Sequence, residues 1–483
     1  MGRERFLGYI ACTRARQRLV VSRARQDNDG AALNPSPFFA HLNRLFPGSP
    51  VEKFAPPDWR EAWHLSELAG PLARAGEHPP LLRELLGQPA FASLRRQLTS
   101  FACVTEPRPL EPAQAARLYG PALRASVSRL EEFAACAFRF FVRSGLRAEE
   151  RQQFELDVRE RGSFQHEVLA RFHQDLQREG KKWRDLAPSE ARLRVKESVA
   201  RVLPSFREGL LGASAQARFA ARTVTESLQD FVAATVEWMA QYEFDPCQVE
   251  LGFGMEDGPL PAWELDLNGG RRLVFRGFID RVDLCRAGNE DAALAVVVDY
   301  KSSARKLDKV LLAHGLQLQL PAYLGVLRHL RDTRKVFGVG SLAPAGVFFV
   351  NLRGQFEHGD TRREILDKRE QFRQRRYQHS GRFDFTALPH LDNRRAGEGT
   401  QFKFRLNANG EPDARNTDLM RPEAFADMLD HVEAELVRMG GEIYAGVIGL
   451  NPYQKGGERA CDKCQYQGIC RFDPWEHAFR VLR

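Results

Sequence analysis

Two aspartates and a lysine stand in two apolar segments that have the composition of β-strands. The segment 272–284 carries Asp280, and the segment 294–301 is nearly all apolar until it ends in Asp299 and Lys301. Side chains alternate along a strand, so Asp299 and Lys301 share one face. Hydrolysis of a phosphodiester needs a divalent ion held by carboxylates, and a nearby lysine can orient the nucleophile or offset developing charge. The sequence therefore predicts a metal-dependent phosphodiesterase site here.

The two segments are separated by a turn-rich stretch, residues 286–291. We therefore expect adjacent antiparallel strands, with Asp280 sharing a face with apolar residues of the first. A salt bridge at a sheet edge would explain an Asp-x-Lys pair equally well, and that pair alone is a weak signal. Glu250 and Asp283 also lie near strand ends, and we interpret them as supporting or structural residues.

Two further motifs flank these strands. Gly162-x-x-x-His166 lies in a segment with helical apolar periodicity, 162–176, and Gln319-x-x-x-Tyr323 lies in a helix predicted after the second strand. A single histidine on a helix flank is more often structural than functional. The series of motifs together favours a nuclease site over a structural interpretation.

This series resembles the RecB-type branch of the PD-(D/E)XK nucleases, over about residues 126–474. The resemblance implies that His166, Asp280 and Asp299 bind Mg²⁺ or Mn²⁺. It implies that Lys301 assists catalysis together with the two aspartates.

The same resemblance makes Gln319 and Tyr323 supporting members of the catalytic motif set, near the DNA.

Four cysteines form a second constellation: Cys461-x2-Cys464-x5-Cys470 and the distant Cys136. A Cys-x2-Cys loop can direct two thiolates at one metal, and both zinc and 4Fe-4S clusters accept four thiolates. Spacing alone favours zinc. With its flanking residues, however, Cys136 completes a pattern similar to the iron-sulfur pattern of the AddB family, nuclease-bearing subunits of bacterial helicase-nucleases. The resemblance implies a 4Fe-4S cluster that joins the two ends of the nuclease segment.

The other four cysteines are isolated in the sequence, and we interpret them as small core residues: Cys12, Cys103, Cys247 and Cys285.

The N-terminus holds a different motif, Ala11-x-Thr13-Arg14-Ala15-Arg16. It resembles the last motif of UvrD-like helicase domains, although the sequence lacks the Gly-x-x-x-x-Gly-Lys-Ser/Thr phosphate loop. Either the chain is the C-terminal portion of a longer protein, which we favour, or a helicase remnant serves as scaffold. We do not expect this chain to hydrolyse ATP.

These motifs predict three regions. Residues 1–50 would be the tail of a UvrD-like helicase fold, a short helix running into a β-strand, and 51–120 a Pro-rich helical connector. Residues 121–483 would form an α/β nuclease domain, a mixed sheet flanked by helices. A helix beginning at Ser128, with Glu131 at capping-box spacing, would carry Cys136.

Composition is compatible with this picture. The 483 residues carry a formal net charge of +8, which favours a polyanionic partner without identifying one. The run 362–377 mixes many cations with acids, which favours a solvated helix over a phosphate-tracking surface, although one helix can be both. No apolar run is long enough to span a membrane, so we expect a cytoplasmic protein in which metal ligation explains close cysteines better than disulfides.

The leading hypothesis is a Mg²⁺-dependent DNA exonuclease that processes double-strand breaks beside a UvrD-like, AddA-type helicase partner. One alternative is a non-catalytic DNA-binding scaffold on the same fold, against which the intact Asp280, Asp299 and Lys301 speak. Another alternative is a stand-alone single-strand exonuclease, which the helicase-like N-terminus disfavours.

Overall fold

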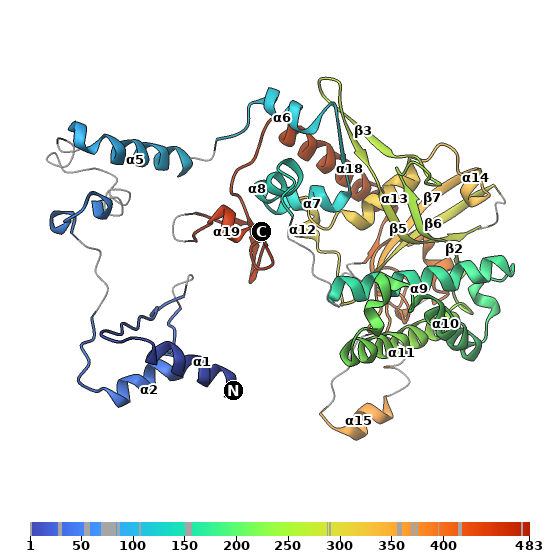
Figure 1. Cartoon of the computed structure of the whole chain (residues 1–483). Coiled ribbons are helices and arrows are strands. Elements are labelled where there is room, and N and C mark those ends of the chain that lie inside the picture. The colour runs from blue at the N-terminus through green and yellow to red at the C-terminus, as the bar shows by residue number, and fades with distance from the viewer. Residues whose placement is uncertain are drawn as a thin grey trace. The chain divides into compact units, whose positions relative to one another are not determined.

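The computed structural model describes most of the chain (Figure 1). The described residues are 2–27, 31–52, 58–68, 84, 87–105, 108–149, 157–286, 288, 291–354, 360–368, 372, 375–394, 396–413, 418–474 and 477–483. They divide into two units: unit 1 is 1–108 with 467–479, and unit 2 is 109–466 with 480–483.

Unit 1 is built of short helices in its described part. Their bounds are α1 Gly2–Thr13, α2 Pro37–Leu45, η1 Trp59–Glu61, η2 Leu65–Leu68, η3 Pro89–Phe91, α5 Ala92–Thr105 and α19 Gln467–Cys470. The strand expected after the first helix is wrong. Leu19, Val20 and Val21 carry no strand and are exposed, because no described segment pairs with them. The nearest pairing is an isolated bridge between Gln26 and Ala32.

Unit 2 is built around a six-stranded sheet with the order β11-β8-β7-β6-β5-β2. The bounds are β2 Asp245–Phe253, β5 Gly277–Cys285, β6 Ala292–Lys301, β7 Ser341–Asn351, β8 Ser380–Asp384 and β11 Leu419–Met420. β5 pairs antiparallel with β2 and β6, whereas β6 pairs parallel with β7. The sheet is therefore mixed, as expected, and the predicted antiparallel neighbours β5 and β6 are confirmed.

Three smaller sheets accompany it, with orders β1-β4-β3, β13-β12-β14 and β10-β9. Their bounds are β1 Ala122–Ala125, β3 Trp263–Leu267, β4 Arg271–Phe275, β9 Gly397–Glu398, β10 Arg405–Leu406, β12 Tyr453–Lys455, β13 Glu458–Arg459 and β14 Arg480–Val481.

The single strand predicted over 272–284 is in fact two strands in different sheets, β4 and β5. They separate at Arg276, whose amide donates to the carbonyl of Ala125. Gly277 follows, and a Cβ there would lie 3.1 Å from the ring of Phe253, so a larger residue would crowd the start of β5. Because of this break, β5 begins close to Asp280.

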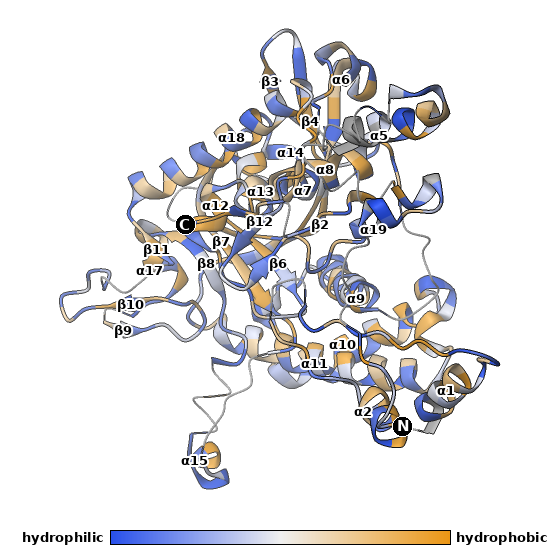
Figure 2. Ribbon diagram, turned by 90° about the vertical axis from the view of Figure 1, so that its left-hand side faces the viewer, coloured by the Kyte–Doolittle hydropathy of each residue, from blue (hydrophilic) through white to orange (hydrophobic). Residues whose placement is uncertain are grey.

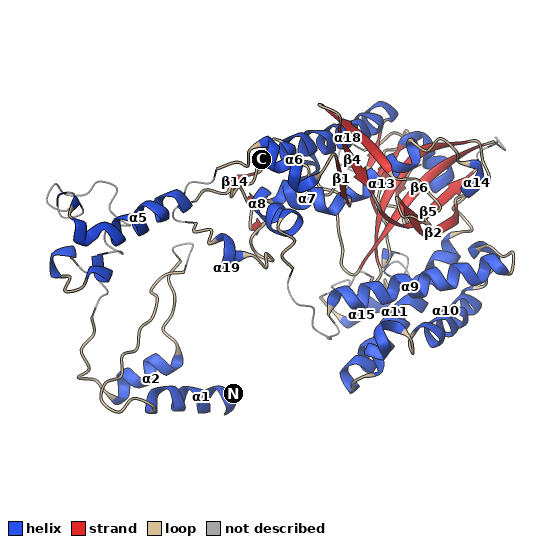
Figure 3. Cartoon of the chain, turned by 45° about the horizontal axis from the view of Figure 1, so that its top comes forward, coloured by secondary structure: helices blue, strands red, loops and turns tan. Residues whose placement is uncertain are grey.

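Helices cover both faces of the large sheet (Figures 1 and 3). The helical bounds in unit 2 are α6 Pro112–Tyr119, α7 Val127–Ala135, α8 Ala137–Phe140, η4 Phe141–Gly145, α9 Val158–Arg178, η5 Trp183–Asp185, α10 Pro188–Val202, η6 Phe206–Gly212, α11 Ala215–Trp238, α12 Lys309–Ala313, α13 Gln319–Arg328, α14 Arg334–Phe337, α15 Arg362–Asp367, η7 Phe385–Ala387, α17 Leu388–Leu391 and α18 Pro422–Tyr444.

Each face of the sheet belongs to its own hydrophobic core. Val297 of β6 packs in the core formed with α7, α13 and α18. Its neighbours Val296 and Val298 pack in the core formed with α9, α10 and α11. The buried residues of α18 recur every three or four positions, and Figure 2 shows hydrophobic and hydrophilic residues alternating along it. Successive side chains of β6 thus pack into the two cores in turn, one on each face of the sheet.

The segment around Cys136 differs from the prediction. The helix begins at Val127 with Ser126 as its N-cap residue, and no capping box forms at Ser128. Cys136 is not within a helix: it is extended, with φ −167° and ψ 117°, between α7 and α8. Glu131, the expected capping partner, instead accepts a hydrogen bond from the amide of Gln319 at 2.7 Å.

Part of the basic run 362–377 forms α15, whose charges pair along its exposed surface, as in Lys368 with Glu364 at 2.9 Å. Residues 369–371, 373 and 374 of this run lie outside the described residues. Among the helices that the structure describes, none is long and apolar enough to cross a membrane.

Candidate active site

The predicted site lies where the pairing between β5 and β6 ends and the two strands continue unpaired with each other. The last paired residues on this side are Arg281 and Val298. Beyond them the amide of Tyr300 donates to Oδ2 of Asp280 at 2.7 Å, which fixes that carboxylate beside β6. Nζ of Lys301 lies 2.5 Å from Oδ2 of Asp299. The structure thus brings Asp280, Asp299 and Lys301 together.

His166 reaches this cluster from α9. Its Nδ1 lies 3.5 Å from Oδ1 of Asp280 and 3.0 Å from Oε1 of Glu250. The ring packs edge-on against Tyr300, with 5.7 Å between the ring centroids. Burial acts to lower the pKa of His166, but the facing carboxylates of Asp280 and Glu250 outweigh it and raise the pKa to about 9.

Glu250 is the member of the cluster that the sequence did not identify as a direct participant. It lies on β2 between Val249 and Leu251, which pair with the residues on either side of Asp280. One ligand atom each from His166, Glu250 and Asp280 lies within 4.8 Å of the others, a spacing that could hold a metal ion. The feature of the sequence that could have identified Glu250 is a carboxylate in β2, which pairs with β5, at the position opposite Asp280.

The two aspartates are buried, and they accept few hydrogen bonds that would offset the cost of burying their charge. Asp280 is 8% exposed and Asp299 only 1%. Burial and the charge of Asp299 raise the pKa of Asp280 to about 7. Neither oxygen of Asp299 accepts a well-oriented hydrogen bond from the residues that the structure describes, although Lys301 approaches one of them. Buried carboxylates facing one another in this way are the donor set that a hard divalent cation prefers.

Gln319 and Tyr323 lie beside the cluster on α13. Nε2 of Gln319 donates to the hydroxyl of Tyr323 at 3.0 Å. That hydroxyl lies 3.5 Å from the position that a Cβ would take at Gly277. Glu131 fixes the start of α13 through the amide of Gln319, and burial raises its pKa while Lys301 opposes the shift. Tyr323 thus lies beside the start of β5, and Glu131 interacts electrostatically with Lys301.

A pocket of about 300 Å³ opens beside His166 and Lys301. Its lining also includes Arg159, Gly162 and Tyr300. A Cβ at Gly162 would meet nothing within 4 Å, so a turn of α9 leaves the entrance open. Of the candidate site residues, His166 and Lys301 line this pocket.

A second pocket, of about 640 Å³, is lined in part by residues that follow β6 in the chain, and it contains more charged residues than the first. Its charged lining residues are Lys306, Asp308, Lys309, Arg375, Arg382, Glu398, Lys403, Arg405 and Asp418. Six of these nine residues are cations. Arg375 and Arg405 pair with Glu398, and Arg382 pairs with Asp418, so the pocket keeps a smaller net positive charge, which favours a polyanion.

Three of the predicted cluster cysteines belong to unit 2. Cys136 is buried, and Cys461 and Cys464 lie in a turn closed by the amide of Cys464 and the carbonyl of Cys461 at 3.1 Å. Cys470 ends α19 in unit 1.

C-terminal residues pack against the elements that flank Cys136. The amide of Ala137 donates to Oδ1 of Asn451 at 2.8 Å, and Arg480 donates to the carbonyl of Ala134. Cys136 between two helices and the Cys-x2-Cys turn of Cys461 and Cys464 have positions that suit thiolate ligands of a metal. Ligation of one cluster by all four cysteines stays a prediction.

Comparison with known proteins agrees with this geometry. Residues 124–471 match the family model of the PD-(D/E)XK nuclease superfamily. The chain is 32% identical to the B subunit of the ATP-dependent helicase/deoxyribonuclease of Moorella thermoacetica, over 98% of this chain and 42% of that protein. It is 30% identical to the protein of the same name from Desulforamulus reducens, over 99% of this chain and 43% of that protein.

The corresponding protein of Symbiobacterium thermophilum is also 30% identical, over 98% of this chain and 42% of that protein. The chain thus spans about two fifths of the length of these curated relatives. They confirm the similarity to helicase-nuclease B subunits predicted from the motifs. With the family match covering most of its length, the chain belongs to the PD-(D/E)XK nuclease superfamily.

Proposed function

We propose that this chain is a DNA exonuclease that uses Mg²⁺ or Mn²⁺ and forms the nuclease part of a helicase-nuclease. The observation that carries the proposal is the cluster of His166 with the buried Asp280 and Asp299 beside Lys301, in which Lys301 approaches Asp299 but neither oxygen of Asp299 accepts a well-oriented hydrogen bond among the described residues. Asp280 near the start of β5, and Asp299 and Lys301 at the end of β6, would supply the carboxylates and the cation that metal-dependent hydrolysis of a phosphodiester needs.

His166, Asp280 and Asp299 would hold the metal ion, and Glu250 would either join them or orient His166. The bound ion would polarise the phosphate and lower the pKa of its water. Asp280 is fixed for this role by the amide of Tyr300. Lys301 would orient the attacking water or offset charge that develops on the phosphate.

DNA is the proposed substrate because the relatives are named as deoxyribonuclease subunits and because the basic pocket offers a surface for a phosphate backbone. The relatives' names also include a helicase, so we propose that this chain acts with an AddA-like helicase partner. Processing of double-strand ends for recombinational repair, in the cytoplasm, is the role that follows. A 4Fe-4S cluster on Cys136, Cys461, Cys464 and Cys470 would be structural.

The test uses anaerobically purified chain and DNA labelled at one end, either double-stranded or single-stranded. With Mg²⁺ we expect progressive loss of label from the end, and none with EDTA. Binding of both substrates without any cleavage would favour the scaffold alternative. Cleavage of single strands alone, unchanged when a helicase partner is added, would favour the stand-alone exonuclease.

A further inference from the structure

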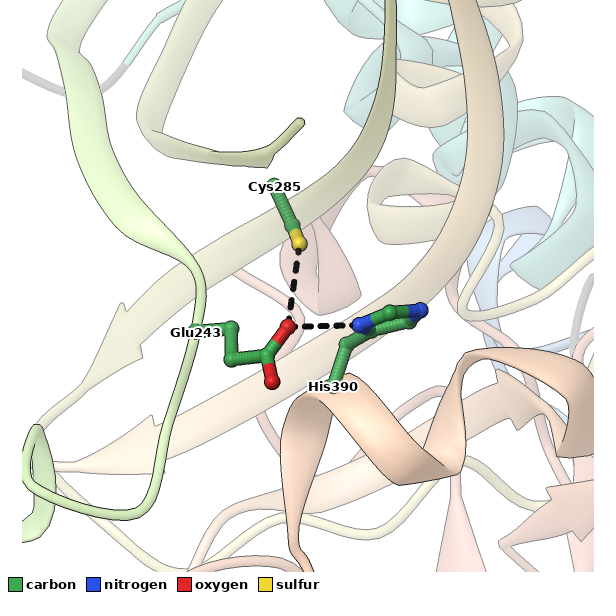
Figure 4. A group of neighbouring side chains, drawn as sticks. All are labelled: Glu243, Cys285 and His390. Atoms are coloured by element: carbon green, nitrogen blue, oxygen red, sulfur yellow. Dashed lines mark hydrogen bonds and ion pairs between the residues drawn. The ribbon is translucent and has the colours of Figure 1, made fainter. Parts of the chain in front are cut away.

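A second group of potential metal ligands lies away from the nuclease cluster, at the other end of β5 (Figure 4). Cys285 is the last residue of β5, Glu243 lies between α11 and β2, and His390 is in α17. Their ligand atoms all lie within 4.8 Å of one another. Three elements distant in sequence therefore present a sulfur, an oxygen and a nitrogen to one point.

Hydrogen bonds hold the three residues in this arrangement. Oε2 of Glu243 is 2.6 Å from Nδ1 of His390 and 3.8 Å from Sγ of Cys285. The amide of Glu243 also donates to the carbonyl of His390 at 2.9 Å, which fixes the two backbones relative to each other. The proximity of Glu243 and His390 is therefore set by the backbone as well as by the side chains.

Burial differs among the three in a way that suits an ion arriving from solvent. Cys285 is 4% exposed, whereas the side chains of His390 and Glu243 are 29% and 59% exposed. The thiol forms the closed floor of the site, and the imidazole and carboxylate form its open side. Water can therefore reach the position opposite the sulfur.

We propose that Glu243, Cys285 and His390 form a binding site for a zinc-type divalent ion, with water as the fourth ligand. Zinc takes thiolate, imidazole and carboxylate ligands at about 2.0–2.3 Å in a tetrahedral arrangement. Such bonds place ligand atoms roughly 3.3–3.7 Å apart, so small rotations of the exposed side chains complete the geometry.

The donor set distinguishes this site from the nuclease cluster. His166, Glu250 and Asp280 offer only nitrogen and oxygen, which suit a hard ion, whereas a thiolate selects a softer one. Along an extended strand Asp280 and Cys285 are about 17 Å apart, so the two sites are separate. An ion here would join the α11–β2 connection and α17 to the end of β5.

A reactive thiol is the alternative chemistry, and the geometry disfavours it. Sγ of Cys285 points to Glu243, which cannot stabilise a thiolate. Burial, followed by the charge of Glu243, raises the pKa of Cys285 to about 11. Metal binding would replace the thiol proton: the S–H bond breaks, the sulfur–metal bond forms and the proton leaves to solvent.

The experiment measures zinc per chain. The full chain is stripped with chelator, dialysed against Zn²⁺ and analysed by mass spectrometry for metal content. The predicted cysteine cluster and the nuclease cluster could also take zinc, so the informative quantity is the difference between variants. Cys285→Ser and His390→Ala should each hold one zinc fewer than the wild type.

Cys247→Ser is the matched control, because Cys247 is a partly buried thiol on the neighbouring β2. It should bind as much zinc as the wild type. His390→Ala keeps the buried thiol and tests the site even if Cys285→Ser does not fold. It should also cleave DNA with Mg²⁺ within twofold of the wild-type rate. Equal zinc content in His390→Ala and the wild type would overturn the proposal, whatever the nuclease assay shows.

Discussion

Among single residues, Glu250 combines a strained backbone conformation with a side chain that contacts the candidate metal site. Its φ is 46°, in the left-handed region that residues with a Cβ avoid. Such a conformation costs about 1–2 kcal/mol and is typical of functional sites. The strained backbone directs its carboxylate to His166, 3.0 Å away.

We predict that Glu250→Gly lowers nuclease activity while it leaves the protein as stable or about 1 kcal/mol more stable, because glycine adopts positive φ without strain. Glu250→Gln keeps the strain and removes the charge, so it should lose activity without that gain. Urea denaturation and Mg²⁺ titration of DNA cleavage measure the two effects. Wild-type activity in both variants would remove Glu250 from the site.

His379 gives a pH prediction at the same scale. It is 1% exposed, and burial followed by the charge of Arg281 lowers its pKa to about 3. The unfolded chain takes up a proton near pH 6.5 and the folded chain does not, so stability present above that pH is lost as the pH falls toward 3. At pH 5 this one group costs about 2 kcal/mol.

His379→Phe should therefore lose about 2 kcal/mol less stability than the wild type between pH 7.5 and 5. Phenylalanine suits the site because Phe348 and Phe402 already pack against the ring. Urea denaturation at both pH values measures the change, with the exposed His329→Asn as control. An equal loss in wild type and His379→Phe would contradict the assignment.

At the scale of elements, β5 carries both a proposed metal ligand and a buried ion pair. Beyond Asp280 it carries Arg281 and Asp283, both fully buried and joined by two hydrogen bonds of 2.7 and 2.8 Å. The hydroxyl of Tyr242 also donates to Asp283, at 2.8 Å. Through Tyr242 and the hydroxyl of Tyr300, which accepts from Arg281, this pair joins β5 to neighbouring elements, in agreement with a structural role for Asp283.

Asp283→Ala should destabilise the protein by roughly 3–5 kcal/mol, because it leaves Arg281 buried without its partner. Asp257→Ala removes an exposed carboxylate and should change stability by less than about 0.5 kcal/mol. Urea denaturation compares the two. A loss below about 1 kcal/mol for Asp283→Ala would show that water reaches Arg281 and compensates it.

The sequence was sufficient to predict the elements whose signals are local. The apolar run of β6 ending in Asp299 and Lys301, and its antiparallel partner carrying Asp280, could be identified from alternation and turn composition. The break at Arg276 could not, because it depends on the pairing of β4 with β1 and β3 rather than with strands of the large sheet.

Interactions between distant elements were also beyond prediction. Glu131 has capping-box spacing, yet the amide of Gln319 is its partner, which only tertiary packing decides. The sequence indicates only a core residue at Cys285, because its neighbours Glu243 and His390 are remote from it in sequence.

At the scale of the whole molecule, the proposed cysteine cluster joins residues from both ends of the nuclease segment. By the chain-entropy estimate, closing so long a loop would stabilise the fold by roughly 5 kcal/mol. Cys464→Ala should therefore lower the Tm and weaken DNA binding, although it leaves Asp280 and Asp299 unchanged. Calorimetry of anaerobic protein measures the Tm, with Cys247→Ala as control. An unchanged Tm in Cys464→Ala would contradict a stabilising cluster.

The measurement that tests the central claim most directly is cleavage of end-labelled DNA with Mg²⁺ by the wild type, Asp299→Asn and Asp266→Asn. Asp266 is an exposed carboxylate on β3, so its variant controls for loss of one negative charge. We predict wild-type cleavage by Asp266→Asn and at least a 100-fold loss in Asp299→Asn, with DNA binding and Tm retained. Equal cleavage by Asp299→Asn and the wild type would show that the cluster on β5 and β6 is not the nuclease site.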